Sequence, residues 1–190
     1  MMRSDKVIGI RMTPQYLLQR AYKWNSNARM LLPADMPAEQ YDFIANLPTG
    51  ALEALQEEIK KKLGLVAELQ TIQTNAWALR VDHPDAPGLK PLTTPSARVS
   101  QPNTIRFRTI PNLVSLLESV TRLPIVDQTG LTGTFDIQVP TSVIRPVPPN
   151  LRGQTDGRIE QLKKTLLDQL GLDLTETNTA MEMLVVKKVN

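Results

Sequence analysis

Two stretches of the chain carry the same amphipathic pattern. In residues 51–63, apolar side chains recur every three or four positions, a spacing typical of a helix with one apolar face. The pattern returns 107 positions later, in residues 158–170, and no gap is needed to align the two. A Leu-Gly-Leu segment ends both, and a glycine suits the left-handed residue that terminates many helices. The alignment therefore predicts two equivalent helices.

The residues after each helix alternate between apolar and polar types. This period of two predicts strands over residues 65–81 and 172–186. Polar clusters near Asn75 and Asn178 interrupt the two stretches at equivalent positions. We therefore predict that each helix is followed by a β-hairpin.

The upstream parts of the two halves also correspond. Each has a short strand, then a helix with proline at an early position, where the missing N–H costs little. Each continues into a second strand. The predicted helices span residues 14–22 and 111–121, and the predicted second strands span residues 41–45 and 135–139. We therefore predict an α+β fold: a tandem duplication of a β-α-β-α-β-β unit, with small, mainly antiparallel sheets and helices packed on one face.

Proline-rich segments separate these parts. Residues 84–102 contain five prolines, which disfavour helix interiors and central strands, so this segment is predicted to be an extended linker. Residues 140–157 are predicted to be a long loop. The predicted organisation is a first repeat over residues 1–83, a linker over 84–102 and a second repeat over 103–190.

Composition excludes several kinds of chemistry. The chain has 190 residues, no cysteine, one histidine and a net charge of +3. Without cysteine it has no disulfide, no thiolate nucleophile and no cysteine-containing zinc site. Glycine-rich phosphate loops and the G-x-S-x-G motif are also absent from the sequence. We therefore expect no enzyme activity, no cofactor, and no catalytic or metal-binding residues.

Three segments resemble a bacterial, soil-associated family of unknown function. Residues 125–137, IVDQTGLTGTFDI, are similar to the family pattern V-V-D-x-T-G-L-x-G-x-Y-D-F. The LDQLGL segment at 167–172 and the hydrophobic strand at 183–189 resemble the family's C-terminal pattern. The resemblance implies a secreted or periplasmic domain without its signal segment. The halves also resemble the short N-terminal domain of secretins and TonB-dependent receptors, which implies protein binding.

Few polar residues suggest a reactive site. Asp127 begins an Asp-Gln-Thr-Gly sequence, for which a turn is the favoured interpretation. His83 begins the predicted linker, where we expect an exposed side chain. The alternative hypothesis is a small-ligand-binding protein or hydrolase with a site between the halves, using Asp127, Asp136 or His83.

The remaining candidates concern partners. Trp77 alternates within a predicted strand and is expected in the core, whereas Trp24 follows a helix and is a weak candidate for partner binding. Nucleic-acid binding would require four arginines to share a face, and we expect no such binding. These arginines are Arg11, Arg20, Arg106 and Arg108. No run of 18 apolar residues predicts a membrane span, although the full-length protein can still be anchored.

The most favoured function is therefore a non-enzymatic, extracytoplasmic interaction or sensing module with an unknown protein or peptide partner. Its binding surface would be an exposed sheet edge or the groove between the halves.

Overall fold

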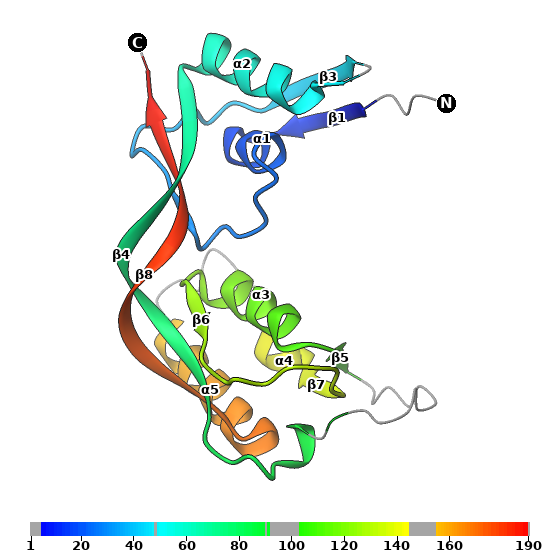
Figure 1. The fold of residues 1–190 in the computed structure, drawn as a ribbon, viewed down its shortest axis with the longest axis vertical. Coiled ribbons are helices and arrows are strands. Elements are labelled where there is room, and N and C mark those ends of the chain that lie inside the picture. The colour runs from blue at the N-terminus through cyan, green and yellow to red at the C-terminus, as the bar shows by residue number, and fades with distance from the viewer. Residues whose placement is uncertain (1–4, 48, 90, 92–102, 145–154, 190) are drawn as a thin grey trace. The chain divides into compact units, whose positions relative to one another are not determined.

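The computed structural model describes residues 5–47, 49–89, 91, 103–144 and 155–189 (Figure 1). Helices and small, mainly antiparallel sheets confirm the α+β class. The chain forms two compact units: unit 1 comprises Met1–Ile72 and Ala180–Asn190, and unit 2 comprises Gln73–Thr179. These units do not follow the predicted boundaries at residues 83 and 103, because two long strands contribute to both.

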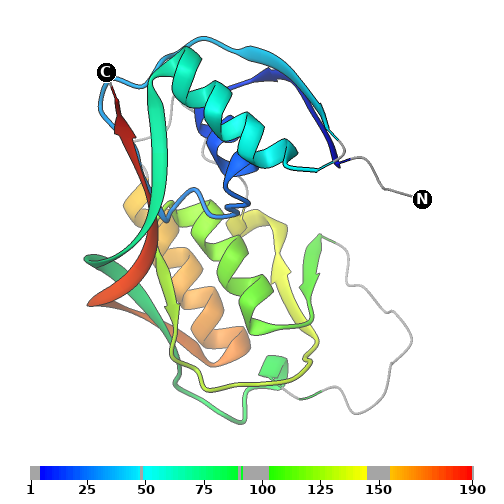
Figure 2. The same cartoon turned by 45° about the horizontal axis from the view of Figure 1, so that its top comes forward.

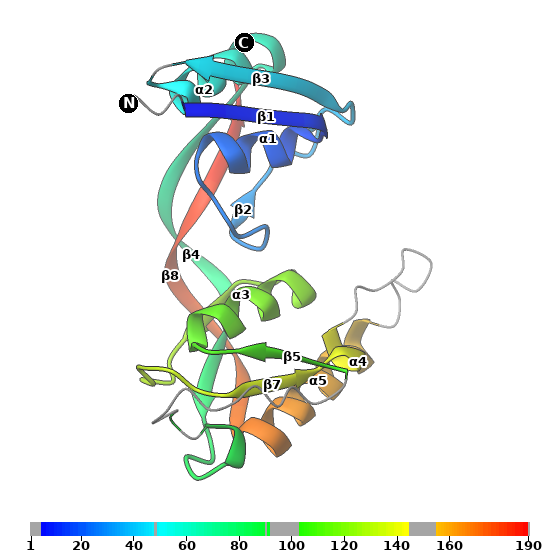
Figure 3. The same cartoon turned by 90° about the vertical axis from the view of Figure 1, so that its right-hand side faces the viewer.

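Unit 1 packs two helices between two sheets. Its elements are β1 (Asp5–Met12), α1 (Pro14–Ala21), β2 (Met30–Leu31), β3 (Tyr41–Leu47), α2 (Ala51–Leu63), the first part of β4 (Leu65–Val81) and the last part of β8 (Leu172–Lys188). β1 and β3 lie side by side as an antiparallel pair (Figure 3). β2 pairs with β8 in parallel, and β8 pairs with β4. Apolar residues from both helices and both sheets form one core, which includes Leu18, Leu65 and Leu184.

Unit 2 has a similar plan. Its elements are the rest of β4 and β8, η1 (Pro87–Leu89), β5 (Thr104–Phe107), α3 (Ile110–Thr121), β6 (Ile125–Asp127), β7 (Ile137–Pro140), α4 (Thr141–Ile144) and α5 (Thr155–Leu170). β5 pairs antiparallel with β7, and β6 pairs with β4 in parallel. Helices α3 and α5 contribute to the same core (Figure 2). That core includes Leu79, Leu117, Leu166 and Leu172.

The strands β4 and β8 correct the hairpin prediction. Each is one continuous strand of 17 residues, without the turns predicted near Asn75 and Asn178. The two strands pair with each other and lie side by side in Figure 1. The Asn178 side-chain amide donates to the Asn75 amide oxygen at 2.6 Å. Tight hairpin turns favour glycine at positive φ, and residues 73–75 and 178–180 contain none.

The paired strands β4 and β8 form a two-stranded ribbon. Backbone hydrogen bonds near its two ends fix the direction and register of the pairing. Within unit 1, the Val189 N–H donates to the Gly64 carbonyl at 2.8 Å. Within unit 2, the Asp82 N–H donates to the Gly171 carbonyl at 2.8 Å. The start of one strand thus faces the end of the other, so the pair is antiparallel.

Parts of the two proline-rich segments are structured. Leu89, in the predicted linker, is buried in the core of unit 2, and Pro91 forms a β-bridge with Phe135. In the predicted loop, α4 buries Val143 and Ile144. Apolar side chains anchor these segments despite the neighbouring prolines. Residues 92–102 and 145–154 lie outside the described residues.

The predicted helix boundaries are close to those observed. Thr13 and Thr109 cap α1 and α3, each accepting a hydrogen bond from a backbone N–H three residues later. Gly64 and Gly171 end α2 and α5 with a φ of 61°. Both glycines therefore adopt the predicted left-handed conformation.

Replacing the glycine after α5 tests this termination. Gly171→Ala is expected to lower the free energy of unfolding by more than about 2 kcal/mol, because left-handed backbone alone costs alanine about 1–2 kcal/mol. In addition, its Cβ would lie 2.3 Å from the His83 carbonyl oxygen. Gly130→Ala is the control, because Gly130 has φ +65° and a Cβ there would have no atom within 4 Å. Urea unfolding of both variants measures the difference, and equal losses would contradict the steric explanation.

A contact between β4 and β8 lowers the pKa of Glu68 in unit 1. Lys187 on β8 donates to the carboxylate of Glu68 on β4, and this hydrogen bond and the lysine's charge lower the pKa of Glu68. The ionised pair therefore stabilises the fold at neutral pH, and the effect is lost as pH falls through the lowered pKa. We expect Lys187→Met to raise the Glu68 pKa, measured by NMR titration. Lys188→Met is the control, because Lys188 bonds to Asp35 instead. An unchanged Glu68 pKa in Lys187→Met would contradict this assignment.

Candidate functional site

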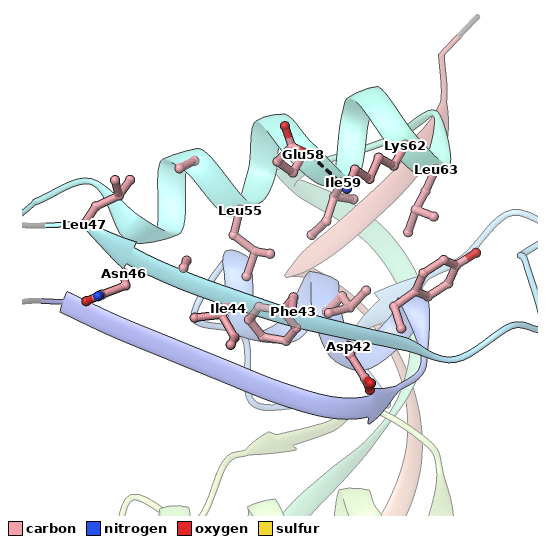
Figure 4. Close-up of a pocket in the computed structure, with 14 residues that line it drawn as sticks. Asp42, Phe43, Ile44, Asn46, Leu47, Leu55, Glu58, Ile59, Lys62 and Leu63 are labelled. Carbon is pink, nitrogen blue, oxygen red and sulfur yellow. Dashed lines mark ion pairs between the residues drawn. The ribbon is translucent and has the colours of Figure 1, made fainter.

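An apolar groove runs between α2 and β3 in unit 1 (Figure 4). Its volume is about 670 Å³. Residues from α1, β3 and α2 line it: Leu17, Tyr41, Asp42, Phe43, Ile44, Ala45, Asn46, Leu47, Ala54, Leu55, Glu58, Ile59, Lys62 and Leu63. Most of these side chains are apolar, so the groove suits an apolar occupant.

The amphipathic pattern of α2 explains one wall. Leu55, Ile59 and Leu63 follow one another at intervals of four residues, which places them on one helix face. In Figure 4 these side chains point from α2 toward β3. Leu55 and Ile59 are buried, whereas Ala54 beside them is half-buried. The helix thus presents apolar surface to the strand, with one small side chain within that surface.

Charged groups at the groove have partners within unit 1. Lys62 lies 3.5 Å from the Glu58 carboxylate, and the two residues form an ion pair four positions apart on the helix. The Asp42 carboxylate accepts the backbone N–H of Arg11 at 2.6 Å. Arg11 has a positive φ of 53° and lies in the irregular part of β1. Asp42 therefore holds the adjacent strand in place.

The opposite wall is an edge strand. Among the described residues, β3 forms a strand ladder with β1 alone, so its other edge is unpaired. Ile44 is 72% exposed and faces Ile8, which is 49% exposed, and Ile10 on β1 is 66% exposed. β3 therefore combines an open edge, the groove beside it, and the exposed Ile44, which lies next to the exposed isoleucines of β1.

The sequence identified the parts of this site without their arrangement. It predicted the apolar face of α2 and the strand containing Phe43. It did not show that the open edge of β3 lies beside this helix. The apolar residues at positions 8, 10 and 44 could have indicated this site. A pair of strands with apolar residues on both faces buries one face in the core and leaves the other available for a second surface to cover.

Two of the three polar candidates, Asp127 and Asp136, take up structural roles in unit 2. The Asp127 carboxylate accepts the Thr129 N–H at 2.9 Å and its hydroxyl at 2.7 Å, which confirms the predicted turn. Asp136 on the approach to β7 forms an ion pair with Arg106 on β5. His83 is exposed, as expected, and its Nδ1 lies 2.6 Å from the Asp82 carboxylate. In the described part of the chain, no group of three or more potential metal ligands occurs.

The two tryptophans both pack against core residues. Trp77 packs on the core of unit 2, as predicted, and Lys163 lies 4.1 Å from the centre of its ring. Trp24 packs on the core of unit 1 and is only partly exposed. Its indole nitrogen is buried, and no described residue forms a hydrogen bond with it. A role of Trp24 in partner binding stays a prediction, and it is not among the residues that line the groove.

Two further predictions concern nucleic-acid binding and membrane spans. Arg11 and Arg20 belong to unit 1, whereas Arg106 and Arg108 belong to unit 2. The Asp136 ion pair gives Arg106 a structural role. The expectation of no nucleic-acid binding stays a prediction. Within the described ranges, no helix has the length and apolar character needed to cross a bilayer.

The contribution of the Arg106–Asp136 ion pair to the stability of unit 2 can be measured. Their side chains are 19% and 30% exposed, so we expect a coupling free energy of up to about 1 kcal/mol in a double-mutant cycle of Arg106→Ala and Asp136→Ala. Pairing Arg108→Ala with Asp136→Ala is the control and should show coupling close to zero. Urea unfolding provides the four free energies of each cycle. Equal coupling in the two cycles would contradict the proposed role of Asp136.

A comparison with known proteins assigns the chain to a family. The family described as "Protein of unknown function (DUF3738)" matches residues 15–189. No curated protein and no solved structure matches the chain. The match agrees with the expected family of unknown function, whereas the likeness to secretins and TonB-dependent receptors stays a prediction. Because the match spans most of the sequence, the chain belongs to the DUF3738 family of proteins of unknown function.

Proposed function

We propose that this chain is a non-enzymatic module that binds an extended segment of a partner protein along β3. One observation carries the proposal: the edge of β3 with which no described strand pairs lies beside an apolar groove. An edge strand offers backbone N–H and C=O groups to an added strand. The groove adjoins that edge and can receive side chains from the same segment.

The two faces of β3 indicate the chemistry of the partner. Side chains of an added strand alternate between its faces. Those on one face would lie in the groove near Leu55 and Ile59, and those on the other would lie beside Ile44. The charges at the groove are already paired, so they add little preference for a charged segment. The proposed partner segment is therefore extended and apolar on both faces.

The proposal includes two elements that rest on other grounds. An extracytoplasmic location rests on the resemblance to the soil-associated family alone. The absence of catalysis rests on composition and on the structural contacts of Asp127, Asp136 and His83. The groove volume of about 670 Å³ also lies within the range of small-molecule sites, so binding of a small ligand there is the competing outcome.

A charged side chain placed in the groove tests the proposal. Random peptides displayed on phage would be selected on the unmodified chain, and the selected peptides synthesised with a fluorescent label. Ala54→Arg should weaken their binding at least about tenfold, or about 1.4 kcal/mol, because arginine fills an apolar site. Glu57→Arg is the matched control, because it introduces the same side chain on the same helix outside the groove. Fluorescence anisotropy measures both affinities.

The backbone of the peptide tests the binding mode. Strand addition requires every second peptide N–H to bond with β3, so N-methylation of those amides should abolish binding. Methylation of the intervening amides should have a smaller effect. The proposal is wrong if no selected peptide distinguishes Ala54→Arg from Glu57→Arg. It is also wrong if neither set of methylated amides lowers the affinity.

A further inference from the structure

Each unit completes its sheet with a strand segment from the other half of the sequence. In unit 1, the last part of β8 lies between β2 and β4, and its Leu184 and Val186 are buried in the core. In unit 2, the last part of β4 lies between β6 and β8, and its Leu79 is buried in the core. Neither core is formed by a single continuous stretch of chain.

The two insertions are equivalent in detail. Val189 bonds to Gly64 in unit 1, and Asp82 bonds to Gly171 in unit 2. Donor and acceptor in these bonds are each related by the same offset of 107 residues that aligns the two halves. The inserted segment also has a parallel neighbour in both units, Met30 facing Leu184 and Ile125 facing Trp77. This correspondence supports a duplication in which the two halves exchanged their last strand.

One face of the crossing region of the ribbon is exposed and mostly polar, whereas its other face carries the half-buried Ile72 and the buried Met181. The unit boundary falls after Ile72 on β4 and after Thr179 on β8. The exposed positions around it include Thr71, Asn75, Asn178 and Glu182. Because these side chains are not buried in either core, they do not determine which copy of the chain supplies the next part of the ribbon.

We propose that residues 180–189 are an exchangeable strand and that a second copy of this chain supplies them to unit 1, which forms a reciprocal strand-exchanged dimer. An exchanged segment makes the same bonds whether it comes from its own chain or from an identical one. The site is specific for this segment, because it buries Leu184 and Val186 and bonds Lys187 to Glu68. A second copy therefore matches the site fully.

The fraction of exchanged dimer should depend on protein concentration, because residues 180–189 are covalently connected to the rest of their own chain. A tethered segment has an effective concentration on the order of 1 mM, so the intrachain arrangement dominates in dilute solution. Exchange between copies requires unit 1 to release the segment. Refolding at a chain concentration approaching about 1 mM should therefore form the dimer, and refolding near about 1 μM should form the monomer.

A pair of cysteines reports which copy supplies the strand. The register set by the Gly64, Asn75 and Asp82 contacts places Thr71 across from Glu182 within unit 1. The chain has no other cysteine. Thr71→Cys/Glu182→Cys, refolded and then oxidised with glutathione disulfide, should give intrachain links at low concentration. Covalent dimers should increase at least tenfold at high concentration, measured on a non-reducing gel.

Two matched pairs control this result. Asn75→Cys/Asn178→Cys lies wholly within unit 2, where exchange of residues 180–189 leaves both positions in the same chain. Its covalent dimers measure random collision. Thr71→Cys/Asn75→Cys would link only in a closed β4 hairpin, because four residues of a strand span about 13 Å, too far for a disulfide. We expect no link in this pair.

Complementary full-length variants provide a second measurement. Leu184→Asp damages the inserted strand and Leu65→Asp damages the core that receives it, since both leucines are fully buried in unit 1. Mixed and refolded together, the variants should form a heterodimer with one intact unit 1, detected by native mass spectrometry. The proposal is overturned if no heterodimer forms and covalent dimers of the 71/182 pair stay at the level of the 75/178 pair at every concentration.

Discussion

The pairing of β4 with β8 is the constraint on which both units depend. Each strand has 17 residues, about three times the length of an average strand, and each enters two cores. At one end of the ribbon, Leu65 and Leu184 are buried in unit 1, and at the other, Leu79 and Leu172 are buried in unit 2. Small units of this size have limited apolar surface to bury. Their folding is therefore coupled, because each unit lacks part of its core until the other half of the sequence is present.

Local features of the fold were predictable, and the strand exchange was not. The helix over residues 51–63 and its terminal Gly64 follow from periodicity and backbone preference within one short segment. In a closed β4 hairpin that kept the observed register within one half of the sequence, Thr71 would face Asn75. In the structure it faces Glu182, which is the counterpart of Asn75 in the other half. Both arrangements give the same alternation of exposed and buried positions, so the pattern of side chains does not distinguish them.

The groove illustrates a second limit of sequence reasoning. Its two walls were predicted as separate elements, a helix with an apolar face over residues 51–63 and a strand over residues 41–45. The proposed binding surface arises only from their juxtaposition, which depends on contacts between residues far apart in the chain. Asp127 and Asp136 were candidate site residues in the sequence. In the structure Asp127 stabilises a turn and Asp136 stabilises a strand pair. In a family without an assigned reaction, the arrangement of apolar surface is therefore more informative than the polar motifs.

The strand exchange and the groove meet at the end of α2. Gly64 terminates this helix, and its carbonyl accepts the Val189 N–H of the inserted strand. The preceding residue, Leu63, lines the groove. A Cβ on residue 64 would lie 2.9 Å from the Val189 carbonyl oxygen, so the helix end and the strand approach closely. The inserted strand thus fixes the helix end that forms one wall of the groove. Residues 180–189 therefore also shape the groove proposed to bind a partner segment.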